Sequence, residues 1–183
     1  MSTGRILAEP EAVIIRGRKV LDLTKVETVY RKSLKTIMLK IETHTMSPGD
    51  RRLRVLMPDD LAEVLHAIYA LYDDDQEHLV MLILNGGGDV TGYKLVSTGS
   101  QDSAIADPRA VYRNALMLGA AAIIIVHDHP SGDIAPSKAD LDMTRQLARA
   151  GDLMNVELLD HIIYTPKNQL SLKAAMPDLF AVE

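Results

Sequence analysis

One stretch of the sequence decides the fold that we predict: Val126-His127-Asp128-His129-Pro130-Ser131-Gly132-Asp133-Ile134-Ala135-Pro136-Ser137-Lys138-Ala139-Asp140. Residues 120–126, which lead into this stretch, form an isoleucine-rich apolar run. Such a run is typical of a buried strand that delivers side chains to a sheet edge. Side chains two apart in a strand point to the same side. We therefore expect His127 and His129 to face one side of the sheet and Asp128 the other.

A helix is predicted directly after the loop that follows these histidines. Ser137 opens a run of residues with helical spacing, which places Asp140 in the first helical turn. A catalytic zinc site takes three protein ligands and leaves a fourth position to water, and His127, His129 and Asp140 could supply those three. The same pattern allows a purely structural interpretation, because Ser137 and Asp140 also have the spacing of a helix capping box. The residues alone leave both interpretations open.

The motif also resembles a known family. His-x-His-Pro, then six residues, then Ser-x-x-Asp is similar to the motif of the JAB/MPN-plus (JAMM) metalloproteases, and His-Asp-His-Pro-Ser-Gly-Asp resembles the RadC-like branch. The resemblance extends from about Leu61 to about Leu172, and it implies an α/β (α+β) domain in which helices flank a mixed sheet, as in cytidine deaminases. The sequence departs from the RadC-like pattern at Asp128, where asparagine is usual. It also lacks the helix-hairpin-helix module of full-length RadC proteins.

The resemblance implies a zinc-dependent metallohydrolase of the metallopeptidase or isopeptidase type, with one zinc ion per chain and a peptide or isopeptide-linked protein as substrate. His127, His129 and Asp140 would be the metal ligands, and Ser137 would donate a hydrogen bond to the developing oxyanion. Glu77, taken alone, is most simply a solvated charge at a strand start, but the resemblance assigns it the general acid/base role. The alternative is a DNA-associated, RadC-like accessory protein of a mobile element, with a structural metal or weak nuclease activity. The resemblance is compatible with a homodimer.

Composition narrows the functional classes. The chain has 183 residues, 47% of them hydrophobic, which is enough for a buried core in the single-domain range. It has no cysteine, which excludes disulfides, thiolate zinc sites and the P-C-x-x-C motif of zinc deaminases. The sequence contains neither H-E-x-x-H nor an apolar run long enough to span a membrane. We therefore predict a cytoplasmic protein without a membrane partner.

Charge divides the chain into two parts. Residues 1–56 hold 12 Lys and Arg against 6 Asp and Glu, while residues 57–183 hold 8 against 19. We expect 1–56 to be a basic N-terminal extension with a β-hairpin packed on the core, and 57–183 to be the RadC-like domain. The basic segment could contact nucleic acid or lie against the acidic remainder, and we favour the second because no nucleic-acid-binding motif accompanies it.

The remaining elements follow from periodicity and turn residues. Strands are predicted through Leu39 and Ile41, over 52–57, over 79–84, over 90–97 and over 156–165, with a final short strand near Leu170. Helices are predicted from Pro58 and from the Asp107-Pro108 cap to Gly119, and Gly151 is expected to cap the helix that contains Asp140. His44 and His66 are expected at the surface. His161 could be a core histidine or a residue that orients a metal ligand, and we favour the core.

Overall fold

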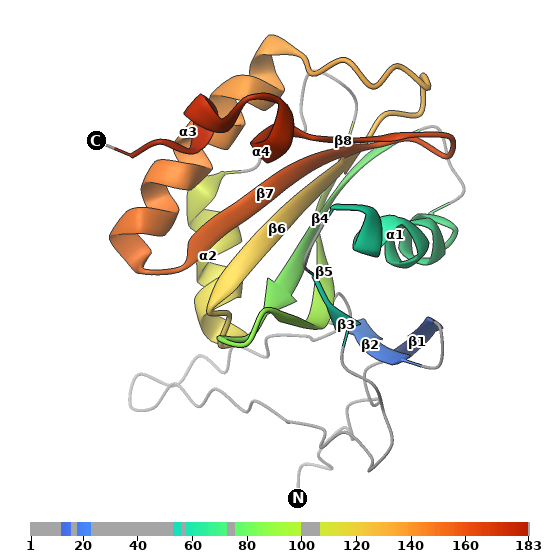
Figure 1. Cartoon of the computed structure of the whole chain (residues 1–183), viewed down its shortest axis with the longest axis horizontal. Coiled ribbons are helices and arrows are strands. Elements are labelled where there is room, and N and C mark those ends of the chain that lie inside the picture. The colour runs from blue at the N-terminus through green and yellow to red at the C-terminus, as the bar shows by residue number, and fades with distance from the viewer. Residues whose placement is uncertain are drawn as a thin grey trace, which may run out of the picture.

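The fold is built on one mixed β-sheet (Figure 1). This computed structural model describes residues 12–15, 18–22, 53–55, 58–72, 76–99 and 107–182. The strands in these ranges are β1 (Ala12–Ile15), β2 (Arg18–Asp22), β3 (Leu53–Arg54), β4 (Glu77–Leu84), β5 (Asp89–Gly99), β6 (Ala122–Asp128), β7 (Glu157–Tyr164) and β8 (Gln169–Ser171). Their order is β1-β2-β5-β4-β6-β7-β8, with β3 also paired to β5. β2 with β5 and β6 with β7 are parallel pairs, and the others are antiparallel. The predicted mixed sheet is therefore confirmed.

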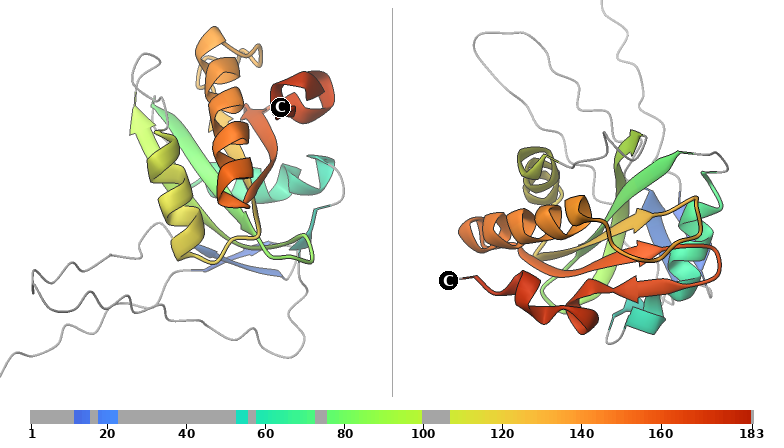
Figure 2. Two further views of the ribbon diagram at one scale, coloured as in Figure 1. Left: turned by 90° about the vertical axis from the view of Figure 1, so that its left-hand side faces the viewer. Right: turned by 90° about the horizontal axis from the view of Figure 1, so that it is seen from above.

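Helices cover both faces of this sheet (Figure 2). They are α1 (Ala62–Tyr69), α2 (Pro108–Met117), α3 (Lys138–Met154) and α4 (Leu172–Ala175), with the 3-10 turns η1 (Pro58–Leu61) and η2 (Pro177–Phe180). Figure 2 shows α1 on one side and α2 and α3 on the other. None of the helices in the described ranges is long and apolar enough to cross a membrane.

The central strand β4 explains the two-layer core. All eight of its residues are buried, because it has strand neighbours on both edges and helices on both faces. Val80, Leu82 and Leu84 join the core cluster that contains α1. Leu79, Met81 and Ile83 join the cluster that contains α2 and α3. Alternation along the strand therefore places Glu77 on the α2/α3 face.

Local sequence signals account for most helix ends. Asp107 accepts a hydrogen bond from the backbone N–H of Arg109 at 2.9 Å, and Pro108 occupies the first turn of α2. The chain leaves α2 through Gly119 at φ +67°. The prediction that Gly151 caps α3 is wrong, because α3 continues to Met154 and ends at Asn155 at φ 53°. Asparagine tolerates this left-handed conformation better than most residues do.

The N-terminal part is only partly described. β1 and β2 form an antiparallel hairpin that joins the sheet through β5, although the sequence of this segment gives no confident periodicity. The predicted strand through Leu39 and Ile41, and with it His44, lies outside the described residues. Within the predicted strand 52–57, Leu53 and Arg54 form β3 and pair with β5.

Candidate metal centre

The predicted site residues converge at one end of the sheet. β4 runs antiparallel to β6 with Leu79 opposite His127, so the start of β4 lies beside the end of β6. Glu77 is the first residue of β4, and His129 directly follows β6. Asp140 lies in the first turn of α3, which crosses the same face of the sheet. Three elements therefore bring together side chains that are up to 63 residues apart in the sequence.

His127 lies between two carboxylates. Its Nδ1 is 3.0 Å from Asp140 Oδ1, and its Nε2 is 3.2 Å from Glu77 Oε2. The second oxygen of Asp140 is 3.7 Å from His129 Nε2, which is an ion-pair distance and too long for a hydrogen bond. The two imidazole rings lie perpendicular to each other, with 4.9 Å between their centroids. All four side chains are buried, so these contacts are shielded from solvent.

A backbone carbonyl selects the tautomer of His129. Its Nδ1 is 2.6 Å from the carbonyl oxygen of Asp133. Because a carbonyl oxygen can only accept, Nδ1 carries the proton and the neutral ring keeps a lone pair on Nε2, which faces Asp140. The carboxylate of Asp140 raises the pKa of His129, against the opposing effect of burial. In the neutral form, His129 Nε2 is available to a metal ion.

Asp140 is held in its ionised form by the start of α3. Its Oδ2 accepts hydrogen bonds from Ser137 N at 2.8 Å and Ser137 Oγ at 2.7 Å, and Asp140 N donates to Ser137 Oγ at 3.2 Å. Burial by itself would raise the pKa of Asp140, but the hydrogen bonds from His127 and Ser137, together with the nearby imidazole of His129, hold that pKa well below its usual range. The capping box predicted as the structural interpretation is therefore present, and it orients Asp140 toward the two histidines.

The side chains at this site are of types that bind divalent cations. Imidazole nitrogens and carboxylate oxygens are zinc ligands, and here they are buried and preorganised. Ligand atoms of Glu77, His127 and His129 all lie within 4.8 Å of one another. The carboxylate in this group is Glu77, whereas the predicted ligand set contains Asp140 instead. Asp140 lies next to the group and contacts both imidazoles. The structure thus contains a group that could bind a metal, with carboxylates on two sides of His127.

Further hydrogen bonds, from Thr144 on α3 and His161 on β7, support the backbone of Asp140. Thr144 Oγ1 donates to the backbone oxygen of Asp140 at 2.6 Å and lies 2.7 Å from His161 Nδ1. Since the hydroxyl has one proton, His161 Nδ1–H must donate to Thr144. Burial, followed by the charge of His127, lowers the pKa of His161 to about 3. His161 is thus a neutral core histidine that also links β7 to the helix carrying Asp140, whereas His66 is exposed as predicted.

Sequence reasoning did not identify every residue around the site. Asp128 faces away from the histidines, as alternation predicts, but its partner was missed. It accepts a hydrogen bond from His78 N, and its Oδ2 lies 3.3 Å from His78 Nδ1. Thr144 was also missed as a partner of Asp140. The period-two pattern could have indicated His78, because it follows Glu77 and must face the same side as Asp128.

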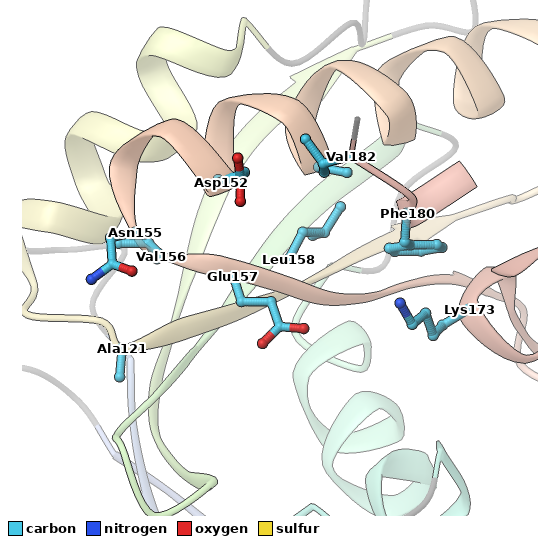
Figure 3. Close-up of a pocket in the computed structure, with 11 residues that line it drawn as sticks. Ala121, Asp152, Asn155, Val156, Glu157, Leu158, Lys173, Phe180 and Val182 are labelled. Carbon is cyan, nitrogen blue, oxygen red and sulfur yellow. The ribbon is translucent and has the colours of Figure 1, made fainter. Parts of the chain in front are cut away.

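A pocket elsewhere in the molecule is separate from this site. Its volume is about 750 Å³, and it is lined by the end of α3, the residues around the beginnings of β6 and β7, and residues 173–182 (Figure 3). Among them are Ala121, Glu157 and Lys173. The ammonium group of Lys173 lies 4.7 Å from the ring centroid of Phe180. Ala121 directly precedes β6, whereas His127 is the second-last residue of β6. The pocket therefore lies at the opposite end of this strand from the candidate metal centre.

Comparisons with known proteins agree with this fold. The family model for the RadC-like JAB domain matches residues 55–176. A UPF0758 protein of Carboxydothermus hydrogenoformans is 38% identical over 126 residues, which cover 69% of this chain and 55% of the relative. A UPF0758 protein of Bacillus licheniformis is 36% identical over 164 residues, covering 87% of this chain and 72% of the relative. The chain thus spans little more than half the length of the first of these relatives.

Proposed function

Since this chain belongs to the RadC-like JAB domain family, we propose that it is a zinc-dependent hydrolase of peptide or isopeptide bonds. The observation that carries the proposal is the position of His127 between two buried carboxylates, beside a second histidine whose Nε2 is available. A zinc ion bound here would act as a Lewis acid that polarises the substrate carbonyl and lowers the pKa of water. We assign His127, His129 and Asp140 as the residues that hold the ion.

Glu77 is proposed to move the proton. Its carboxylate is buried, and one of its oxygens lies within 4.8 Å of a ligand nitrogen of His127 and of His129, so it lies beside the proposed ion site. It would accept a proton from the attacking water and give that proton to the leaving nitrogen as the carbon–nitrogen bond breaks. The new carbon–oxygen bond completes a carboxylic acid, and the nitrogen leaves as an amine. No proton or electron is left over in this assignment.

Ser137 is proposed to stabilise the negative charge that develops on the substrate oxygen. In this structure its hydroxyl donates to Asp140 Oδ2. The residue is exposed, and a hydroxyl rotates freely enough to redirect its proton toward a substrate oxygen. Ser137 N still holds Asp140 when the hydroxyl turns away. A donor placed in this way typically contributes on the order of 100-fold to the rate.

Cleavage of a panel of peptides and ubiquitin-like conjugates tests this proposal. We expect cleavage that a chelator abolishes, that added zinc restores, and that Glu77→Gln lowers by at least about 100-fold. Glu157→Gln is the matched control, because Glu157 is exposed and lies at the far end of β7, and it should cleave at the wild-type rate. Cleavage that survives both the chelator and Glu77→Gln would refute the assignment.

The uneven charge of the sequence supports a second candidate, association with DNA. The basic residues that would carry it precede residue 57 and include Arg31, Lys32 and Lys35. Binding of duplex DNA that weakens steeply with salt, and that weakens further when these three residues are changed to glutamine, would favour this function. The hydrolase and DNA assays measure different activities of the same protein, so one result does not depend on the other.

A further inference from the structure

Side chains join β4 to β6 beyond the last backbone pair of these strands. The paired register between the strands ends at Leu79 and His127. One residue further, the carboxylate of Asp128 accepts from the backbone N–H of His78, and its Oδ2 lies 3.3 Å from His78 Nδ1. This contact extends the connection by one position. It lies immediately beside Glu77 on one strand and His127 on the other.

The helix α1 supports this contact from the face opposite the candidate metal centre. The side chain of His78 is 2% exposed, and its ring stacks on Tyr72, which lies three residues after the end of α1, with 4.7 Å between centroids and 17° between planes. The hydroxyl of Tyr69 donates to the backbone oxygen of Val126 at 2.9 Å and lies 3.4 Å from that of His78. The ends of both strands are therefore fixed by the same helix.

Alternation along the strands connects the two faces. His78 follows Glu77, and Asp128 lies between His127 and His129, so each member of the contact is adjacent in sequence to a site residue on the other face. Beyond the pair of Leu79 and His127, this contact links the start of β4 to the end of β6 through the Asp128 side chain. It lies directly behind the 3.2 Å contact between Glu77 and His127.

We propose that His78 and Asp128 form a positioning pair that holds Glu77 against His127. Neither residue reaches the face where the reaction is proposed, so both act through their neighbours. The catalytic consequence rests on the proposed function of Glu77, but the positioning itself does not. It can therefore be tested on the metal-free protein, without turnover.

Two variants of Asp128 separate positioning from general packing. Asp128→Ala removes the acceptor for His78 N–H. Asp128→Asn keeps an oxygen to accept from His78 N–H and gains an amide that can donate to His78 Nδ1, so it should rescue the contact. The matched control is Asp160→Asn. Asp160 also accepts from backbone N–H groups, those of His161 and Lys173, but it is a buried carboxylate on β7.

Two NMR measurements report the result in the full-length, metal-free chain. Hydrogen exchange of the His78 amide should be on the order of 10- to 100-fold faster in Asp128→Ala than in wild type, because the bond to a carboxylate is lost. The imidazole ¹⁵N resonances of His127 should shift in Asp128→Ala in the same direction as in Glu77→Gln. Asp128→Asn and Asp160→Asn should resemble wild type in both measurements.

Clear outcomes would overturn the positioning pair. Unchanged His78 exchange and unchanged His127 resonances in Asp128→Ala would refute it, and so would equal changes in Asp160→Asn, which would indicate general loosening. If the NMR results are as expected but the wild-type protein neither binds zinc nor cleaves any substrate, the proposed function fails while the positioning pair stands. If the protein is active, Asp128→Ala should lower kcat with little change in KM, and Asp128→Asn should restore it.

Discussion

Acid should destabilise the metal-free protein through His161. This side chain is fully buried on β7, its Nδ1 donates to Thr144, and its Nε2 has no partner within the described part of the chain. Burial, followed by the charge of His127, lowers its pKa to about 3 in the folded protein. The perturbation to test is a decrease in pH from 7 to 5, in wild type and in His161→Leu, which has a similar volume and no titrating group.

The magnitude follows from proton linkage. An unfolded histidine has a pKa of about 6.5, so below that pH the unfolded chain takes up a proton that the folded protein does not. The stabilisation that comes from keeping His161 neutral is therefore complete above about pH 6.5 and is lost as the pH falls toward 3. At pH 5 the loss is about 2 kcal/mol. For a chain of this size this corresponds to a decrease in Tm of about 4–8 °C.

Urea unfolding at pH 7, 6 and 5, followed by far-UV circular dichroism, measures this effect. We expect wild type to lose about 2 kcal/mol more than His161→Leu between pH 7 and pH 5. The difference between the two proteins removes the contribution of the other titrating groups. His66→Gln, which changes an exposed histidine on α1, should follow the wild-type curve. Parallel curves for wild type and His161→Leu would show that His161 is not held neutral by burial.

Three further predictions concern packing, capping and metal binding. Gly151→Ala should lower the free energy of unfolding, measured in urea, by about 2–4 kcal/mol. The new Cβ would lie 2.5 Å from the Tyr112 hydroxyl oxygen and 2.6 Å from the backbone oxygen of Val156. An effect below about 0.5 kcal/mol would contradict this packing. Ser137→Ala should cost about 1 kcal/mol in the same assay through loss of the N-cap, and full stability would argue against the capping box. Zinc at 100 times its Kd should stabilise the wild type by about 2.7 kcal/mol and raise its Tm by about 5–10 °C, and His129→Ala should show no such increase in thermal scans.

The candidate site could be predicted from the sequence because its main signals are local. His127 and His129 are separated by one residue at the end of an apolar run, and strand alternation alone places them together. Ser137 and Asp140 follow within one helix start, and the capping box has a recognisable spacing. The mixed sheet flanked by helices was also predicted. Glu77 required the family resemblance, because nothing near it in the sequence distinguishes it from other acidic residues.

Contacts between distant segments could not be predicted in the same way. The partner of Asp128 is 50 residues earlier in the sequence, and the link from His161 through Thr144 to Asp140 depends on how α3 crosses β7. Gly151 illustrates the difference between conformation and packing. Its sequence position suggests a helix cap, but the helix continues through it to Met154. Glycine is needed there because Tyr112 and the backbone of Val156 approach so closely that a side chain has no room. Such reasons become visible only when α2, α3 and β7 are placed together.

Which carboxylate holds the proposed zinc ion is tested most directly by zinc affinity in two variants. Asp140→Asn and Glu77→Gln each remove one of the carboxylates beside His127, and competition with a chromophoric chelator measures the zinc Kd of each protein. We predict one zinc ion per chain in wild type and in Glu77→Gln. In Asp140→Asn we predict a loss of affinity larger than the roughly 10- to 100-fold that follows loss of an outer hydrogen-bond partner. A wild-type protein that binds no zinc, or a zinc site that survives Asp140→Asn but not Glu77→Gln, would contradict the account.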